Sequence, residues 1–272
     1  MVATLTFRSL LVLCTATVTV TSAEYFEGDG TTYTLGEVSS GNCNFMSSNS
    51  IAPMNYAALN AEQWNNLSNC GRCAQVSCID SRCVDTTASA IVQIVDQCPE
   101  CKHGDLDLSH SVFRAITGSD PSRFTIRWQF VDCPDPETVK ICLKNGANGY
   151  WLAVQPTNSL VGVQSISINN QATTMLDGAY YYLVTSSTGV DLNAVNVSVT
   201  SIYSDVIEGT YILTSGQCTD TYQQFPSPTT TTWTAATTEA PITPADAPTA
   251  SPTYAPAVTT SSSKCYVRHN RN

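Results

Sequence analysis

The sequence predicts an all-β protein with two disulfide-tied domains, and three observations support this prediction. Runs of alternating or β-branched residues recur between residues 88 and 213, with turns rich in Asn and Gly in the second half. Helical patterns are confined to two short stretches. The cysteines divide into a dense group that ends at Cys133 and a separate pair, Cys142 and Cys218. We therefore expect a disulfide-rich β-barrel, then a β-sandwich, then a tail.

The first residues have the features of a secretory signal. Arg8 precedes an apolar run over residues 10–20, and small residues precede Glu24. The apolar run is too short to span a bilayer. We expect an extracellular monomer that makes no membrane contact. Its expected parts are a signal peptide at 1–23, a barrel domain at 24–134, a sandwich domain at 135–218 and a disordered Thr/Pro/Ser-rich tail at 219–272.

Export places the cysteines in an oxidising compartment, which favours disulfides. The spacing of Cys70 with Cys73 and of Cys98 with Cys101 also fits a zinc ribbon, and the second pair has the form of a redox motif. We favour disulfides and expect no metal and no cofactor. Four bridges are expected in the first domain and one in the second, while Cys265 is free or pairs between chains. The bridging residues are Cys43, Cys70, Cys73, Cys78, Cys83, Cys98, Cys101, Cys133, Cys142 and Cys218.

The elements of the first domain follow from local patterns. Gly28–Thr34 is a predicted glycine turn that runs into a short Thr/Tyr strand, and Ala88–Val95 and Phe124–Val131 are predicted strands. Two stretches are predicted short helices: Asn55–Trp64, with Asn55 as its cap, and Val112–Thr117, between a Ser109 cap and Gly118. Strict alternation in the last strand places Phe124, Ile126, Trp128 and Phe130 on one face.

The stretch Asp96–Ser109 concentrates the polar chemistry of the chain. It lies between a predicted strand and a predicted helix, so we expect its carboxylates on a constrained loop. Crowding of Asp96, Glu100, Asp105 and Asp107 raises the pKa of at least one of them, which suits a general acid. Glycoside hydrolysis needs such an acid together with a second carboxyl. The sequence therefore predicts a polysaccharide site here.

Several motifs together resemble the first domain of expansins, exported proteins that loosen plant cell walls. The motifs are Gly30-Thr-Thr-Tyr-Thr34, Asp96-Gln-Cys-Pro-Glu100, Gly104-Asp-Leu-Asp-Leu-Ser109 with Phe113, and Arg127-Trp128. Family 45 glycoside hydrolases and barwin-like proteins share their order more loosely. The resemblance implies a six-stranded double-psi β-barrel.

The resemblance also implies roles for individual residues. Asp107 matches the aspartate that expansins share with the acid of the related hydrolases, and Asp96 matches a second site aspartate. Thr32, Tyr33 and Thr34 lie on the strand that lines the same groove. Thr34 stands near the position of the hydrolases' base, so we expect little or no hydrolysis. Asp29 and Glu37 flank this strand as alternative bases.

The second domain is predicted to be a β-sandwich with five principal strands. They are Tyr150–Val154, Val161–Ile168, Tyr180–Thr185, Val195–Ile202 and Val206–Leu213. By resemblance this is the immunoglobulin-like, cellulose-binding domain of expansins, and Tyr150, Trp151 and Tyr180 match its aromatic platform. Neighbouring strand residues face opposite sides, so one of Tyr150 and Trp151 belongs in the core. We favour an exposed Trp151.

Charge narrows the choice of partner. The chain carries a net charge of -10, which disfavours nucleic acid and acidic wall polymers. Cellulose, xyloglucan or other neutral glucans are the expected partners. Asn66 and Asn196 begin acceptor sequences for N-glycans, and the Thr/Pro/Ser tail fits an O-glycosylated spacer.

The leading prediction is a non-hydrolytic, secreted protein that binds cellulose and matrix glucans and loosens plant-type cell walls. One alternative is a weak endo-β-1,4-glucanase of the family 45 type. Another is a non-catalytic glucan-binding surface or elicitor-like protein.

Overall fold

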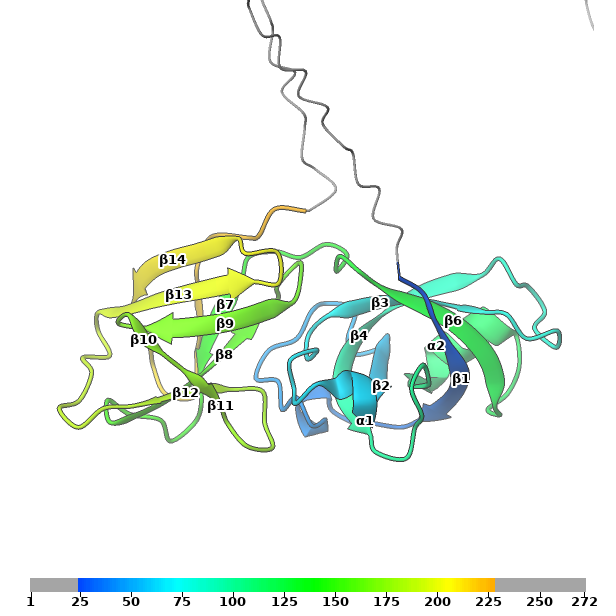
Figure 1. Ribbon diagram of the computed structural model, residues 1–272, viewed down its shortest axis with the longest axis horizontal. Coiled ribbons are helices and arrows are strands. Elements are labelled where there is room, and N and C mark those ends of the chain that lie inside the picture. Colours follow the sequence, from blue (N-terminus) through cyan, green and yellow to red (C-terminus); the bar gives the residue numbers. More distant parts are fainter. Residues whose placement is uncertain (1–23, 228–272) are drawn as a thin grey trace, which may run out of the picture. The chain divides into compact units, whose positions relative to one another are not determined.

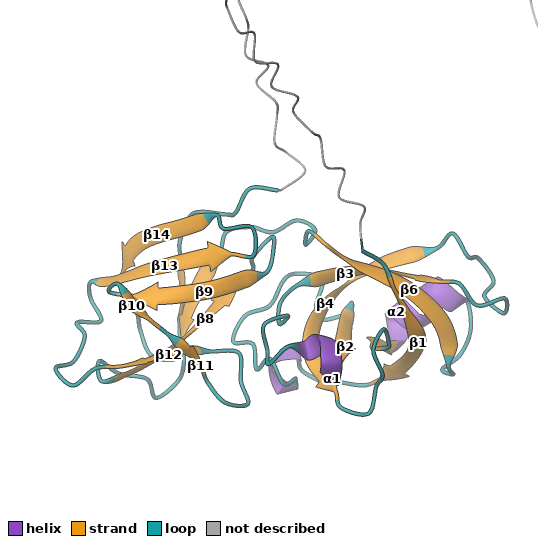
Figure 2. Ribbon diagram, in the orientation of Figure 1, coloured by secondary structure: helices purple, strands orange, loops and turns teal. Residues whose placement is uncertain are grey.

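The computed structural model describes residues 24–227, which form a closed six-stranded barrel and two further sheets (Figure 1). The predicted signal peptide, the tail beyond residue 227 and Cys265 lie outside the described residues. Strands dominate the described chain, and the helices are short (Figure 2). The all-β, disulfide-rich prediction is confirmed.

The barrel closes in the order β1-β5-β2-β4-β3-β6. Its strands are β1 (Phe26–Tyr33), β2 (Tyr56–Asn60), β3 (Cys73–Cys78), β4 (Ser89–Cys98), β5 (Leu106–Ser109) and β6 (Phe124–Val131). The pairs β1/β5 and β2/β4 are parallel, and the other neighbours are antiparallel. The helical segments are η1 (Val38–Ser40), α1 (Ala61–Trp64) and α2 (His110–Thr117).

Strand β6 and helix α2 form where the sequence predicts them. Phe124, Ile126 and Trp128 of β6 are buried, and the Trp128 Nε1–H donates to the Gly104 carbonyl at 2.8 Å. The Ser109 hydroxyl accepts from the Val112 N–H at the start of α2, and Gly118 ends the helix with a φ of 68°. Alternation of apolar and polar residues therefore predicted β6, and the two capping residues predicted α2.

The predicted helix over Asn55–Trp64 is wrong for its first half. Residues Tyr56–Asn60 form strand β2, which lies between β4 and β5 and is buried along its whole length. Helix α1 begins only after Asn60, whose side chain accepts from the Gln63 N–H at 3.0 Å. Helix propensity is worth only tenths of a kcal/mol per residue, roughly, so pairing with two neighbouring strands outweighs it.

The second part of the described chain contains a four-stranded sheet, β10-β9-β13-β14, and a five-stranded sheet, β11-β12-β8-β7-β15. The strands are β7 (Lys140–Leu143), β8 (Trp151–Thr157), β9 (Val163–Ile168), β10 (Gln171–Ala172), β11 (Thr174–Met175), β12 (Tyr182–Thr185), β13 (Val195–Ser201), β14 (Val206–Tyr211) and β15 (Cys218–Asp220). The Tyr182 hydroxyl of one sheet donates to the Val163 carbonyl of the other at 3.3 Å. The sheets therefore face each other as a sandwich. The specifically immunoglobulin-like topology stays a prediction.

The ordered chain continues beyond the predicted boundary at residue 219. Strand β15 pairs with β7, and Phe225 is buried. The Gln224 side-chain amide donates to the Asn158 carbonyl at 2.9 Å. The predicted tail therefore starts too early, because these residues complete the edge of the five-stranded sheet.

The ten cysteines of residues 24–227 form five disulfides: Cys43–Cys70, Cys73–Cys133, Cys78–Cys83, Cys98–Cys101 and Cys142–Cys218. Four bridges hold the barrel, and one joins β7 to β15. Every cysteine sulfur in this part of the chain is bonded to another cysteine sulfur. The cysteines whose spacing suggested a zinc ribbon therefore supply no thiolate ligands.

Candidate functional site

The parallel pairing of β1 with β5 brings Thr31 opposite Asp107. The Thr31 hydroxyl donates to Oδ1 of Asp107 at 2.8 Å. Asp107 is half-buried, and this burial is the main cause that raises the pKa of its carboxyl. The charges of Glu100 and Asp96 raise the pKa further, whereas the Thr31 hydrogen bond opposes the shift. Asp107 is thus a carboxyl that holds its proton unusually well.

Asp96 lies near the end of β4 and is held by backbone groups. Its Oδ1 accepts from the Asn42 N–H at 2.8 Å and from the Gln97 N–H at 2.9 Å. The predicted loop location is therefore wrong for the two principal carboxylates: Asp96 is part of β4 and Asp107 is part of β5. Rigid strands, rather than a loop, position them.

Tyr33 lies on the same face as the two aspartates, close enough for their charges to act on its hydroxyl. Its ring packs edge-on against Tyr56 at 5.4 Å. Burial raises the pKa of the Tyr33 hydroxyl, and the charges of Asp96, Tyr56 and Asp107 raise it further. We define the polar face of the barrel as Thr31, Tyr33, Asp96 and Asp107.

Two of the predicted groove residues lie elsewhere. Thr32 pairs with Leu108, which is buried, so its side chain points to the opposite side of β1 from Thr31 and Tyr33. The Thr32 hydroxyl is buried there without a hydrogen-bond partner in residues 24–227. Thr34 is exposed beyond the end of β1. Thr31 was not among the predicted groove residues, although two-residue alternation places it on the same side of the strand as Tyr33.

The other acidic candidates have structural partners or lie in solvent. Asp105 is buried and accepts from the N–H groups of Asp29 at 2.7 Å and Lys102 at 2.9 Å. Asp29 forms an ion pair with Arg123 at 2.8 Å. Glu37 is exposed. Of the two proposed alternative bases, Asp29 is therefore held by Arg123, and Glu37 is exposed beyond the end of β1.

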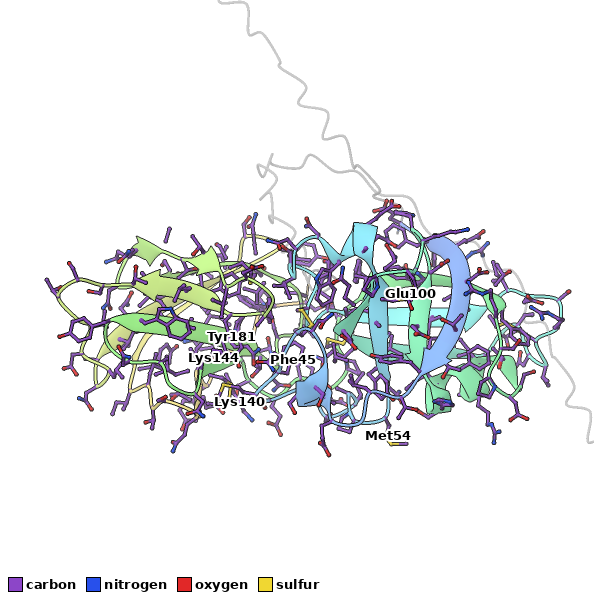
Figure 3. The ribbon with its side chains drawn as sticks, turned by 90° about the horizontal axis from the view of Figure 1, so that it is seen from below. Phe45, Met54, Glu100, Lys140, Lys144 and Tyr181 are labelled. Atoms are coloured by element: carbon purple, nitrogen blue, oxygen red, sulfur yellow. A yellow bond between two sulfur atoms is a disulfide. The ribbon has the colours of Figure 1, made fainter. Side chains whose placement is uncertain are left out.

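Glu100 is exposed between the bridged Cys98 and Cys101 (Figure 3). Its charge raises the pKa of Asp107, as noted above. Among the described carboxylates, Glu100 and Asp96 are the two whose charges act on Asp107 in this way.

The predicted aromatic platform is corrected at Tyr180, and of the neighbouring pair Tyr150 rather than Trp151 is the exposed ring. Tyr150 is 62% exposed, whereas Trp151 is half-buried and packs against the core from the start of β8. Tyr180 is only 2% exposed, and its ring packs against Phe45 at 5.8 Å and Tyr182 at 5.7 Å. Tyr180 therefore belongs to the core, and no sugar ring can stack on it there.

The side of the five-stranded sheet that carries Trp151 follows from strand pairing. Trp151 pairs with Thr185, and Ala153 pairs with Leu183. Thr185 is exposed and Leu183 is half-buried. Trp151, Leu183 and Thr185 thus form a mixed surface on β8 and β12, which we call the sheet face.

A short loop connects the polar face to this sheet. The loop, residues 41–46, includes Asn42, which binds Asp96, and Cys43, whose carbonyl accepts from the buried Gln155 side chain at 3.2 Å. The Asn44 carbonyl accepts from Gln155 at 3.1 Å and from the Tyr181 hydroxyl at 3.3 Å. A cavity of about 470 Å³ adjoins the loop, lined in part by Phe45, Lys144 and Tyr181 (Figure 3).

The two predicted N-glycan acceptors differ in accessibility. Asn66 is exposed. Asn196 is half-buried on β13, and its amide donates to Glu208 at 3.4 Å. Of the two side chains, that of Asn66 is the accessible one.

Residues 24–227 contain neither a membrane-spanning helix nor a cluster of metal ligands. No helix there is long and apolar enough to cross a membrane, and no group of three or more His, Cys, Asp or Glu residues there could hold a metal ion.

Comparisons with known proteins match this architecture. A family model described as lytic transglycolase matches residues 56–124, within the barrel. Expansin-like protein 3 of Dictyostelium discoideum is 29% identical over 164 residues, which cover 56% of this chain and 47% of that protein. The chain spans about half the length of the curated relatives it matches.

Two solved structures of a Clavibacter michiganensis expansin resemble the fold. The apo form gives a TM-score of 0.63 at 23% identity, with 75% of this chain and 99% of the other covered. A mutant in complex with cellohexaose gives 0.63 at 22% identity, with the same coverage. At this identity the likeness concerns the fold.

A closed barrel with parallel β1/β5 and β2/β4 pairs, followed by a β-sandwich, defines the class of two-domain double-psi β-barrel proteins. Together with the sequence relatives, this architecture makes the chain similar to expansin-like proteins.

Proposed function

We propose that this protein is secreted, binds cellulose, xyloglucan or other neutral cell-wall glucans as a monomer, and loosens plant-type cell walls without hydrolysing them. In this proposal the polar face binds and orients a glucan chain, and the sheet face holds a neighbouring part of the polymer. Asp107 is the principal polar contact, with Asp96, Thr31 and Tyr33 beside it.

The observation that supports the proposal best is the loop at residues 41–46. It donates to Asp96 through Asn42 and is bound by Gln155 and Tyr181 of the sandwich. One loop therefore contacts both Asp96 of the polar face and β8, the strand that carries Trp151 of the sheet face. The mutant Clavibacter expansin in complex with cellohexaose provides a ligand of the expected class for a protein of this fold.

The non-hydrolytic character is proposed from the surroundings of Asp107. Hydrolysis needs a second carboxyl that activates water or attacks the sugar. Thr34 carries a hydroxyl, and Asp29 is held by Arg123. The Asp107 carboxyl, which donates when protonated and accepts when ionised, instead suits hydrogen bonding to a neutral sugar hydroxyl.

The test combines two measurements on the same samples: creep of heat-killed plant walls and release of reducing ends from cellulose, xyloglucan and mixed-linkage glucan. Wild type should extend walls without releasing sugar, and Asp107→Asn should lose most of this extension. Glu62→Gln, which alters an exposed carboxylate of α1, is the matched control and should act like wild type. A wild type that leaves wall extension unchanged contradicts the proposal.

One observation favours a second candidate, the weak endo-β-1,4-glucanase. The raised pKa of Asp107 suits a general acid, and Glu100 is a nearby carboxylate. Sugar release by wild type that disappears in both Asp107→Asn and Glu100→Gln would establish this alternative. Release that survives in both variants would indicate a contaminating hydrolase.

A further inference from the structure

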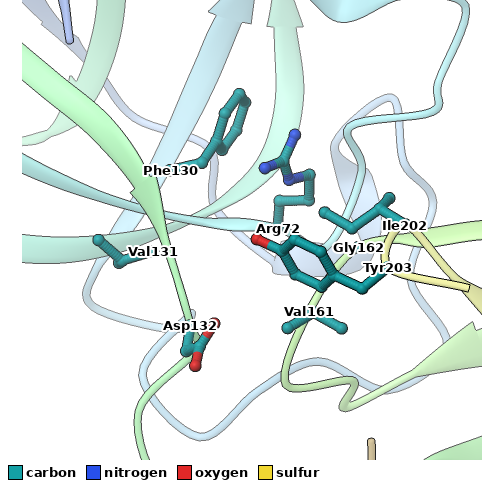
Figure 4. Close-up of a pocket in the computed structure, with 8 residues that line it drawn as sticks. All are labelled: Arg72, Phe130, Val131, Asp132, Val161, Gly162, Ile202 and Tyr203. Atoms are coloured by element: carbon teal, nitrogen blue, oxygen red, sulfur yellow. The ribbon is translucent and has the colours of Figure 1, made fainter. Parts of the chain in front are cut away.

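A second cavity lies away from the polar face and contains an arginine without an acidic partner. The cavity has a volume of about 400 Å³, within the range of about 300–1,000 Å³ common for small-molecule sites. Arg72, Phe130 and Val131 of the barrel line one side, and Val161, Gly162 and Tyr203 line the other (Figure 4). The proposed glucan contacts do not use any of these residues.

The backbone at Arg72 is tightly fixed. Its neighbours Cys70 and Cys73 are bridged to Cys43 and Cys133. The Arg72 carbonyl accepts from the Ile94 N–H at 2.9 Å. Gly162 leaves room for the side chain, because a Cβ there would lie 3.0 Å from Cδ of Arg72. The guanidinium is therefore held in place before any ligand arrives.

The guanidinium has unused binding capacity. Its carbon lies 3.5 Å from the centre of the Phe130 ring, and Nη1 donates to Asn69 at 3.0 Å. Within residues 24–227 Arg72 forms no ion pair, unlike Arg82, which also lies over an aromatic ring but is paired with Asp80 at 2.7 Å. Burial lowers the pKa of Arg72 to about 10, which leaves it charged at neutral pH. A buried cation of this kind favours an anionic ligand.

The walls restrict the shape of that ligand. The half-exposed Tyr203 provides a flat ring, and Val131 and Val161 add apolar surface, while the Phe130 ring is covered by the Arg72 guanidinium. A flat ring of this kind suits the apolar face of a pyranose. Asp132 also lines the cavity and accepts from the Ser227 hydroxyl at 2.5 Å. Because two carboxylates repel each other, a bound carboxylate should turn away from Asp132 toward Arg72.

We propose that this cavity binds a hexuronic acid residue, whose carboxylate pairs with Arg72 while its ring lies against Tyr203. The site is separate from the proposed neutral-glucan surface. It supplies a local cationic contact on a chain whose net charge of -10 otherwise repels acidic polymers.

The experiment titrates the full-length, disulfide-intact protein with three probes by calorimetry or NMR: methyl glucuronide, its neutral counterpart methyl glucoside, and acetate. Wild type should bind the glucuronide saturably and much more tightly than the other two. Arg72→Met keeps most of the apolar stem but removes the charge, and it should weaken glucuronide binding by about tenfold or more. Arg82→Met is the matched control and should bind like wild type.

Tyr203→Ala is the second variant, because this exposed side chain can change without disturbing the core. It should weaken glucuronide binding by about three- to tenfold. The proposal is overturned if wild type does not bind glucuronide saturably, if acetate binds as tightly, or if neither variant changes affinity. Retention on cellulose should stay unchanged in both variants, so this test is independent of the proposed glucan function.

Discussion

The barrel and the sandwich build their proposed binding surfaces in different ways. In the barrel, strand register and backbone donors hold polar side chains, as with Thr31 and Asp107 across β1 and β5. In the sandwich, the surface around Trp151 consists of side chains on regular antiparallel strands. The barrel therefore orients hydrogen bonds, whereas the sandwich offers contact area. Substitution of Trp128 in the barrel and of Trp151 in the sandwich tests this difference.

The largest effect is expected from Trp128→Ala. Trp128 is fully buried in the barrel, and its Nε1–H bonds to Gly104. Truncation leaves a cavity and an unpaired carbonyl, so we expect a loss of about 3–5 kcal/mol in the free energy of unfolding. Urea unfolding of the oxidised protein measures it. A loss below that of Trp151→Ala would contradict the contrast between core and surface.

Trp151→Ala should separate binding from stability. Because Trp151 is half-buried at the start of β8, its removal should lower stability less than Trp128→Ala and should abolish most retention on crystalline cellulose. A pull-down with microcrystalline cellulose measures retention. Tyr180→Phe, in the core, is the control and should be retained like wild type; equal losses in both variants would refute a specific sheet face.

A smaller effect concerns the pH dependence of stability. Burial raises the pKa of Asp107, so the folded protein binds this proton more tightly than the unfolded chain does. Stability should therefore fall as pH rises from the ordinary carboxyl pKa through the raised value, and the loss should persist above it. Asp107→Asn should remove this component of the pH profile in urea unfolding between pH 3 and pH 8. An unchanged profile would show that Asp107 does not cause it.

The smallest effect is expected at the barrel surface. Glu27 pairs with Arg127 across β1 and β6, and both side chains are about half-exposed. Glu27→Gln should cost about 0.2–1 kcal/mol, and added salt should reduce the difference. Thermal unfolding at low and high ionic strength provides the measurement. A cost comparable to that of Trp128→Ala would mean that the pair carries more than surface electrostatics.

The sequence predicted those elements whose side chains show a clear phase. Phe124–Val131 alternates apolar and polar residues, and the structure gives the strand the same bounds. Helix α2 has a Ser cap and a terminal Gly. In Tyr56–Asn60 the small and apolar residues are buried on both sides, so no alternation distinguishes this strand from a helix.

The same argument explains which candidate site residues were misplaced. Gly28–Thr34 carries threonines on both sides of the strand, so composition alone does not indicate which threonine points to Asp107, whereas alternation from Tyr33 selects Thr31. The three consecutive tyrosines at 180–182 likewise carry no phase, because all three rings are buried, with Tyr180 packed against Phe45. Asp96 and Asp107 each lie on a strand of the closed barrel, and the charge of Asp96 raises the pKa of Asp107.

The loop at residues 41–46 has a mechanical consequence. Cys43 is bridged to Cys70, and the loop backbone is bonded to Asp96 on one side and to Gln155 on the other. In the proposed function, a pulling force on a polymer bound to the sandwich would therefore be transmitted through this loop to Asp96 of the barrel.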